Sequence, residues 1–178
     1  MSKSHPTEER KVPALSGATI IDAIKRGGIE FVISVPDRVT SENVLRPLAS
    51  DTEVKLVRVC KEDEGVSICC ALAMCGKRAL LLMQHTGLLD SINALRAIAV
   101  EYQQPIVMMV GLLGHESDAA PAQSTKYGVR IVAPILDAMG IAYEFLCSAG
   151  DEQRIPAAIQ RAYEASSPLV LLIGRSPS

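Results

Sequence analysis

Residues 79–84 read Ala-Leu-Leu-Leu-Met-Gln, and two later stretches, Pro105–Leu113 and Pro168–Gly174, are apolar in the same continuous way. A strand with one face in water alternates apolar and polar residues, whereas a strand covered on both faces does not. These three runs therefore predict the central strands of a parallel sheet that has helices packed on both faces.

Outward from these runs, short apolar segments alternate with segments of helical spacing. The predicted strands are Phe31–Val35, Val54–Val59, Arg78–Gln84, Pro105–Leu113, Ile141–Cys147 and Pro168–Gly174. The predicted helices are Ala18–Arg26, Ser41–Ala49, Gly65–Cys75, Leu88–Glu101, Val129–Met139 and Asp151–Ala165. This alternation indicates a doubly wound α/β fold with a mostly parallel six-stranded sheet. We expect a loose tail over residues 1–15 and one domain over residues 16–178.

The composition excludes several classes of function. Of the 178 residues, 48% are hydrophobic and 21% are charged, as in soluble globular domains. A net charge of −2 and an aromatic content of 3% argue against nucleic acid as a partner. No apolar run approaches the roughly 20 residues of a membrane span. Because Met1–Lys11 lacks the apolar core of an export signal, we expect a cytoplasmic protein.

The cysteines and histidines predict no metal site. Five cysteines are an odd number, and no cysteine pair has zinc-ligand spacing backed by histidines, since the histidines at positions 5, 85 and 115 are scattered. We expect reduced, buried thiols rather than disulfides or metal ligands. The thiols are Cys60, Cys69, Cys70, Cys75 and Cys147.

Polar and titratable residues gather just after the predicted strands. In doubly wound sheets, ligands bind beyond the carboxyl ends of the strands. We expect four such loops to form one site, the alternative being that they are ordinary solvated loops. The loops are Pro36-Asp37-Arg38, Glu62-Asp63-Glu64, Gln84-His85-Thr86-Gly87 and Gly114-His115-Glu116.

Glu64 stands between an apolar strand and a charge-free helical segment, Val66–Cys75. Because ten residues without a charge indicate burial, we expect the carboxylate at the mouth of this helix to be partly desolvated. Desolvation raises the pKa of a carboxyl group and suits it to proton transfer. The alternative is an acid that the helix dipole stabilises by about 0.3–1 kcal/mol.

Six short motifs carry a family resemblance through their order and spacing along the chain. They are Ser34-Val35-Pro36-Asp37, Glu62-Asp63-Glu64-Gly65-Val66, Met83-Gln84-His85-Thr86-Gly87-Leu88, Ile92-Asn93-Ala94-Leu95, Pro121-Ala122-Gln123 and Leu136-Asp137-Ala138-Met139-Gly140-Ile141. From about Ala18 to Gly174, the chain resembles the pyrimidine-binding (PYR) domain of thiamine diphosphate-dependent decarboxylases. It most resembles the alpha subunit of sulfopyruvate decarboxylase and the matching half of phosphonopyruvate decarboxylase.

The resemblance implies an alpha-type subunit of a 2-oxo acid decarboxylase that acts on a sulfopyruvate-like or phosphonopyruvate-like substrate. The family has an acidic stretch that ends in Glu-Gly before a small-residue helix. This pattern selects Glu64, which Gly65 follows, and leaves Glu62 and Asp63 facing solvent or a partner. In the family, this glutamate activates the pyrimidine ring of the cofactor, and the thiazolium ring serves as the electron sink.

The resemblance also implies a second chain. The family holds Mg²⁺ and the cofactor diphosphate with Gly-Asp-Gly or Gly-Asp-Ser and a later asparagine. This sequence contains neither triplet, and no asparagine follows its nearest match, Gly150-Asp151-Glu152. We therefore expect a beta-type partner that carries this motif, in a hetero-oligomer with two or more copies of each chain.

The family assigns further roles by position, and each role has a structural alternative. Arg38 suits a carboxylate, sulfonate or phosphonate of the substrate. His85 replaces a small polar residue of the relatives, which makes it a second catalytic candidate and leaves the substrate open. The expected cofactor contacts are Pro36, Glu64, Gln84, Thr86 and Gly87. The expected substrate contacts are Asp37, Arg38, His85, His115 and Gln123.

Two other functions stay open. One is a carboligase of the acetolactate synthase type, which uses the same cofactor chemistry. The other is a non-catalytic α/β binding module, although the sequence has neither G-x-G-x-x-G nor a Walker motif to support it.

Overall fold

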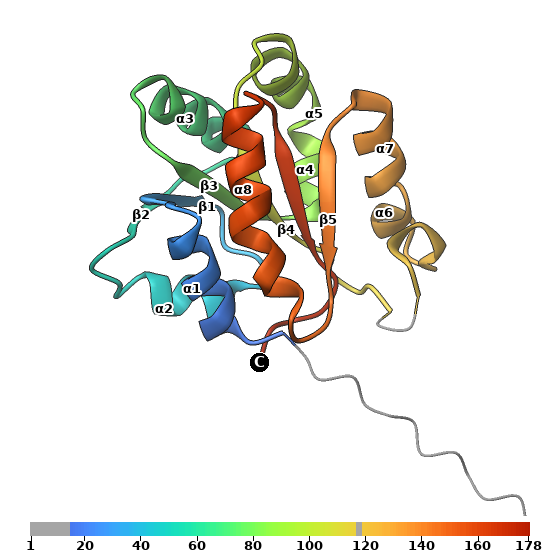
Figure 1. The fold of residues 1–178 in the computed structure, drawn as a ribbon. Helices are drawn as coiled ribbons and strands as arrows, with labels where there is room; N and C mark the ends of the chain where they lie inside the picture. Colours follow the sequence, from blue (N-terminus) through green and yellow to red (C-terminus); the bar gives the residue numbers. More distant parts are fainter. Residues whose placement is uncertain (1–14, 117–118) are drawn as a thin grey trace, which may run out of the picture.

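Six strands form the central layer of the molecule, in the order β2-β1-β3-β4-β6-β5 (Figure 1). The computed structural model describes residues 15–116 and 119–178. Every neighbouring pair of strands is parallel, so the predicted doubly wound parallel sheet is confirmed. The strands are β1 (Phe31–Ser34), β2 (Lys55–Arg58), β3 (Ala79–Gln84), β4 (Val107–Gly111), β5 (Ala142–Leu146) and β6 (Leu169–Ile173).

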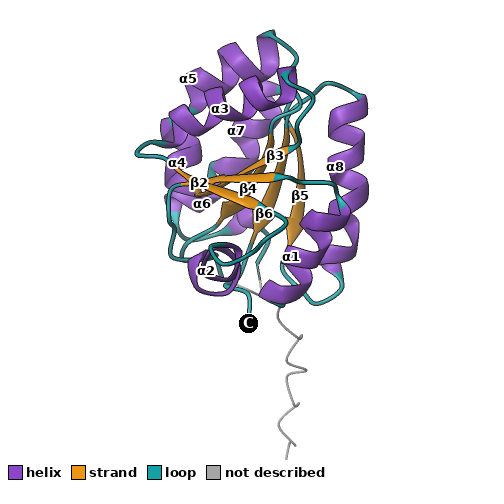
Figure 2. Cartoon of the chain, turned by 90° about the vertical axis from the view of Figure 1, so that its left-hand side faces the viewer, coloured by secondary structure: helices purple, strands orange, loops and turns teal. Residues whose placement is uncertain are grey.

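Helices cover both faces of this sheet, as the side view in Figure 2 shows. One face carries α3 (Glu62–Met74), α4 (His85–Asp90), α5 (Ile92–Ala94), η2 (Leu95–Glu101), α6 (Tyr127–Arg130) and α7 (Val132–Met139). The other carries α1 (Gly17–Arg26), η1 (Ser41–Leu45), α2 (Arg46–Leu48) and α8 (Ile155–Glu164). Two short turns complete the described elements: η3 (Pro121–Gln123) and η4 (Asp151–Arg154).

The continuous apolar sequence of β3 follows from this arrangement. Leu80 and Leu82 belong to the core under α1 and α8, whereas Leu81 and Met83 belong to the core under α3 and α7. Successive side chains of a strand point to opposite faces, so a strand with two covered faces is apolar at every position.

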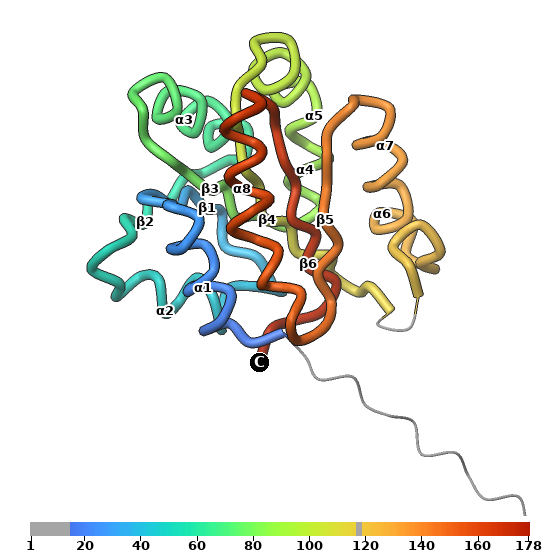
Figure 3. Tube along the Cα trace, viewed as in Figure 1, coloured from blue at the N-terminus to red at the C-terminus, as the bar shows by residue number. Residues whose placement is uncertain are grey.

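The last residue of the chain returns to the first described residues, as the trace in Figure 3 shows. The backbone N–H of Ser178 donates to the carbonyl oxygen of Leu15 (2.8 Å), and that of Gly17 donates to the carbonyl of Ser178 (2.9 Å). Leu15 is 0% exposed, so the predicted loose tail is wrong for this residue. The rest of that prediction, residues 1–14, lies outside the described residues.

Helix α3 differs from its prediction in two ways. It begins at Glu62 rather than Gly65, so all three acids lie in its first turn, where the helix dipole favours negative charge. The helix is also only partly buried: Gly65, Val66 and Cys69 are buried, while the opposite face is open and Met74 is 77% exposed. The open face borders an apolar groove of about 360 Å³ against η2. Absence of charge indicates burial, but nothing in the described part of the chain covers this face.

Gly65 allows α3 to lie directly on the sheet. A Cβ at this position would come within 2.5 Å of Leu81 Cδ1 and 3.4 Å of Ile33 Cγ2, and both of these side chains are fully buried. We expect Gly65→Val to lower the free energy of unfolding by about 1–3 kcal/mol, the usual cost of overpacking a core. Urea denaturation measures this, with Ser67→Val on the exposed face of the same helix as control. Equal losses in the two variants would contradict the close packing.

The five cysteines are free thiols. Cys69 is buried, and burial raises the pKa of its thiol to about 12. Cys60 and Cys75 are exposed, so the predicted burial is wrong for these two: Cys60 follows β2 and Cys75 ends the open face of α3. In residues 15–116 and 119–178, no helix is long and apolar enough to cross a membrane.

Candidate functional site

The loops that follow β1, β2 and β3 meet at the carboxyl edge of the sheet. After β1 the chain crosses to β2 on one side and then to β3 on the other, which makes this edge the switch point where ligands of doubly wound sheets bind. Pro36, Arg38 and Thr86 are exposed here, and Gln84 is half-buried. The side-chain amide of Gln84 donates to the Thr86 hydroxyl (3.0 Å).

Glu62 is the acid of α3 that faces this switch point. A Cβ on Gly87 would lie 2.2 Å from Glu62 Oε1 and 2.3 Å from Glu62 Cδ, so the carboxylate packs directly over the backbone of Gly87 in the first turn of α4. Glu62 is half-buried and Gly87 is buried. Only glycine leaves room for the carboxylate at this place. The contact joins the first turn of α3 to the first turn of α4.

Glu64 caps the start of its own helix instead of facing the switch point. Its Oε2 atom accepts hydrogen bonds from the backbone N–H groups of Cys60 (3.1 Å) and Lys61 (3.3 Å), so it caps the helix that contains it. The side chain is exposed, and the expected desolvation is therefore wrong for the described chain. The neighbouring Gly65, which marked Glu64 in the sequence, is explained by its packing on Leu81.

Asp37 holds the loop after β1. Its carboxylate accepts hydrogen bonds from the N–H groups of Val39 (2.6 Å) and Thr40 (2.5 Å) and from the Thr40 hydroxyl (2.7 Å), and it is 8% exposed. The loop crosses to the end of β4, where a Cβ on Gly111 would lie 2.6 Å from Val39 Cβ. These contacts favour a role in holding the loop over contact with a substrate.

His85 points into the protein rather than into the open edge. The ring is 6% exposed. Its Nδ1 lies 3.4 Å from the carbonyl oxygen of Gly111 and 3.3 Å from the backbone nitrogen of Leu113. A Cβ on Gly128 would lie 3.1 Å from Nε2. The ring therefore fills the space between β4 and α6, which favours a structural role over a proton shuttle.

Burial lowers the pKa of His85 below its ordinary value of 6.5, against a smaller opposite effect of the Gly111 carbonyl. Because the unfolded chain then binds more protons, this histidine favours the folded state fully above pH 6.5 and progressively less as the pH falls through its folded pKa. We expect an NMR titration of the ring Cε1–H signal to show a midpoint below 6.5, and urea denaturation to show lower stability at acidic pH. A midpoint at or above 6.5 would contradict the buried ring.

The remaining predicted residues lie elsewhere. His115 Nδ1 is 2.9 Å from the carbonyl oxygen of Gly174, its Nε2 is 3.0 Å from that of Ala119, and its ring meets Phe145 edge-on at 5.3 Å. These contacts place it over β6 and β5, away from β1 and β2. Gln123 is exposed at the end of η3, which packs against α6 and α7. The structure therefore does not join either residue to the group around Glu62.

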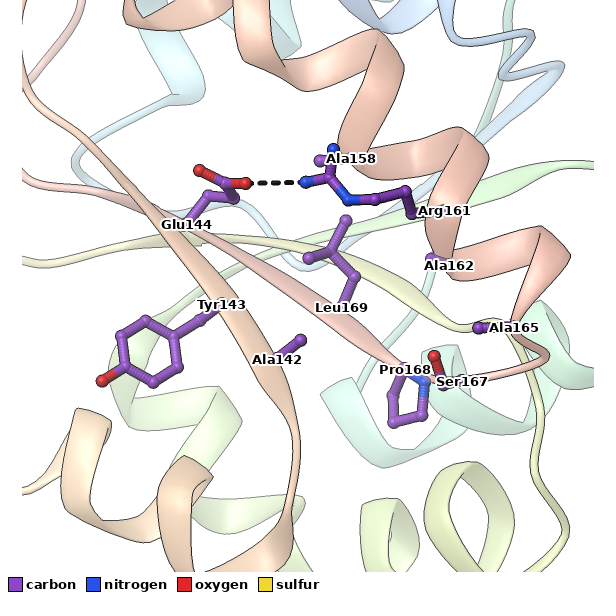
Figure 4. Close-up of a pocket in the computed structure, with 10 residues that line it drawn as sticks. All are labelled: Ala142, Tyr143, Glu144, Ala158, Arg161, Ala162, Ala165, Ser167, Pro168 and Leu169. Carbon is purple, nitrogen blue, oxygen red and sulfur yellow. Dashed lines mark hydrogen bonds and ion pairs between the residues drawn. The ribbon is translucent and has the colours of Figure 1, made fainter.

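A cavity of about 150 Å³ between β5 and α8 lies at the opposite, amino end of the strands (Figure 4). Its carboxylate, Glu144, is bound by Arg161 (2.9 Å) and Arg154 (2.6 Å). Arg154 also donates to the carbonyl oxygen of Phe145 on β5 (2.7 Å). These charges are matched within the protein, and the cavity is not at the switch point. Among the described residues, no group of three histidine, cysteine or carboxylate side chains is arranged to hold a metal ion.

Comparison with curated proteins shows related sequences, although no family model matches the chain. The sulfopyruvate decarboxylase subunit alpha of Methanothermobacter thermautotrophicus is 34% identical over 108 residues, which are 61% of this chain and 65% of that protein. The same subunit of Methanococcus maripaludis is 33% identical over 104 residues, 58% of this chain and 62% of the relative. The sulfopyruvate decarboxylase of Methanosarcina acetivorans is 30% identical over 160 residues, 86% of this chain but 38% of that protein. The chain thus matches less than two thirds of the length of each.

Two solved structures share the fold of this chain. The structure of a putative thiamin diphosphate-dependent enzyme from Mycobacterium smegmatis aligns with this one with a TM-score of 0.66 and 18% sequence identity. The alignment covers 92% of this chain and 32% of that chain. Benzoylformate decarboxylase from Polynucleobacter necessarius aligns with a TM-score of 0.64 and 18% identity over 89% and 30%. By sequence this chain is therefore similar to the sulfopyruvate decarboxylase alpha subunits, and it shares its fold with part of the two thiamine diphosphate enzymes, as the motifs predict.

Proposed function

We propose that this chain is the alpha-type subunit of a thiamine diphosphate-dependent 2-oxo acid decarboxylase. The observation that carries the proposal is the carboxylate of Glu62, half-buried at the switch point and packed on Gly87. The related subunits of sulfopyruvate decarboxylase support the reaction class. The sequence pattern favours Glu64 for the cofactor contact, whereas the geometry favours Glu62, because Glu64 is engaged in capping its helix.

The residues present fit the pyrimidine half of the cofactor. Because Gly87 has no side chain, the carboxylate of Glu62 lies directly against its backbone. Gln84 and Thr86 add amide and hydroxyl groups beside it, and Pro36 an apolar surface. Thiamine diphosphate supplies the electron sink for the loss of carbon dioxide when it is bound. The task of this chain is to hold the pyrimidine and to share a proton with its N1′ atom through Glu62.

The proposal includes a partner chain. Within this sequence there is no Gly-Asp-Gly or Gly-Asp-Ser triplet, so we assign Mg²⁺ and the diphosphate to a beta-type subunit. The open, charge-free face of α3 belongs to the same helix as Glu62 and supports assembly with other chains. We propose a cytoplasmic hetero-oligomer with two or more copies of each subunit.

Co-purification with the partner, followed by a substrate screen for carbon dioxide release, tests this function. The screen should include sulfopyruvate, phosphonopyruvate and pyruvate, each with and without an acceptor aldehyde. We expect release of carbon dioxide from an acid that bears a second anionic group, without need for the aldehyde. A condensation product that appears only with the aldehyde would identify a carboligase instead. No turnover of any 2-oxo acid by the complex would refute the proposal.

A further inference from the structure

We propose that a cavity between β2 and η1 is a subsite for the second anionic group of the substrate, a sulfonate or phosphonate, and that Arg58 binds this group. The inference rests on the proposed function, since it concerns which 2-oxo acid the same edge of the sheet accepts. The cavity has a volume of about 210 Å³, and its lining includes Pro36, Ser41, Leu45 and Arg58. This volume is below the roughly 300–1,000 Å³ typical of drug-sized ligands, so it suits a small acid.

The first argument is the charge of the cavity. Glu42 and Arg46 also line it, but they pair with each other at 2.7 Å and leave no net charge. Arg58 is exposed and has no ion pair or hydrogen bond within the described residues. The cavity therefore carries one unmatched positive charge. A guanidinium group binds sulfonate or phosphonate oxygens through two parallel N–H donors.

The second argument comes from the other arginines of residues 15–116 and 119–178. Apart from Arg38 and Arg58, each has a contact within the protein. These are Arg26, Arg46, Arg78, Arg96, Arg130, Arg154, Arg161 and Arg175. Arg38 follows β1, and Arg58 is the last residue of β2, paired in register with Ser34. Both arginines without such a contact thus lie at the carboxyl edge, where the ligand is expected.

The third argument is the hydroxyl of Ser41, which is buried and has no hydrogen-bond partner within the described residues. Buried polar groups are nearly always satisfied, so an orphan hydroxyl that borders a cavity indicates a missing partner. Because the hydroxyl itself is out of reach of solvent, it meets an oxygen of the bound anion after a rotation of the Ser41 side chain toward the cavity. Pro36 borders the cavity and belongs to the loop after β1, so the cavity adjoins the switch point.

The test compares two substrates in the assembled enzyme. For Arg58→Gln, we expect the KM for sulfopyruvate to rise about 10–100-fold, because the variant loses one charge-assisted hydrogen-bonded contact with the substrate. The KM for pyruvate, which lacks the second anion, should change less than about two-fold on the same reasoning. Arg26→Gln is the matched control, because that arginine pairs with Asp22 on α1. Ser41→Ala should raise only the KM for sulfopyruvate, and by less than Arg58→Gln.

A binding measurement separates the subsite from the proposed function. Inorganic sulfate titrated into the complex should shift the NMR signal of the Arg58 Nε–H group, and Arg58→Gln should weaken sulfate binding. Sulfate binding that depends on Arg58 would uphold the subsite even if the complex released no carbon dioxide. Unchanged kinetics of Arg58→Gln on sulfopyruvate would overturn the subsite and leave the decarboxylase intact. Equal losses with both substrates would also overturn it, because they would indicate a structural role.

Discussion

Glu62→Gln in the assembled enzyme is expected to lower kcat by about 10²–10⁴-fold, the range that a positioned acid–base group contributes. Glutamine has nearly the same shape as glutamate but cannot share a proton with the pyrimidine N1′ atom. Glu64→Gln should leave kcat within a few-fold of the wild type, because Glu64 accepts its hydrogen bonds from the N–H groups of Cys60 and Lys61. Steady-state kinetics at saturating cofactor measure both variants. The reverse pattern would restore the assignment that the sequence pattern favours.

Gly87→Ala tests the same carboxylate without altering it. The added Cβ would fall 2.2 Å from Glu62 Oε1, so Glu62 must move, and kcat should fall. The thermal midpoint should change little, because the displaced group is the free end of a side chain. In a Glu62→Gln background, Gly87→Ala should add little further loss, since two changes that act on one contact are not additive. Additive losses would show that Gly87 acts through another group.

The chain by itself is expected to release no carbon dioxide from any 2-oxo acid, even with thiamine diphosphate and Mg²⁺ present. The reason is that its sequence lacks the triplet that would hold the metal and the diphosphate. Activity should appear on addition of the partner and disappear again when Mg²⁺ is chelated. The matched control replaces the aspartate of the partner's Gly-Asp-Gly motif by alanine, which should leave assembly intact and abolish turnover. Decarboxylation by the isolated chain would refute the two-chain model.

The sequence predicts the sheet well because its signal is local. The run Ala79–Gln84 is apolar on both faces. The observed strand β3 has these bounds, which differ by one residue from the predicted strand Arg78–Gln84. Helix ends carry weaker signals. The pattern predicts a loop for the acids before Gly65, yet they form the first turn of α3. The stretch Leu88–Glu101 was expected to be one helix, but it is divided near Ser91 and Leu95 into α4, α5 and η2.

The site was predicted less well because side-chain direction depends on distant contacts. His85 was selected for its chemistry, but Gly111 and Gly128 decide where its ring lies. The sequence pattern does not select Glu62, because its contact with Gly87 joins the first turns of two separate helices. The one available signal in the sequence is Gly87, three residues after the end of β3. A glycine at such a place indicates that another group lies close to the backbone, but it does not indicate which group. Composition also cannot tell burial by this chain from burial by another one, as the open face of α3 shows.

The hydrogen bond from Arg154 to the backbone of strand β5 has a consequence for how these molecules behave at high concentration. β5 is the edge of the sheet beside β6, and the edge of a sheet is where foreign strands attach during aggregation or strand exchange. Arg154 already occupies the carbonyl oxygen of Phe145, and Glu144 with Arg161 adds charge along the same strand. An incoming strand would have to displace these groups. The sheet is thus protected from lengthening at β5, which leaves β2 as its other edge.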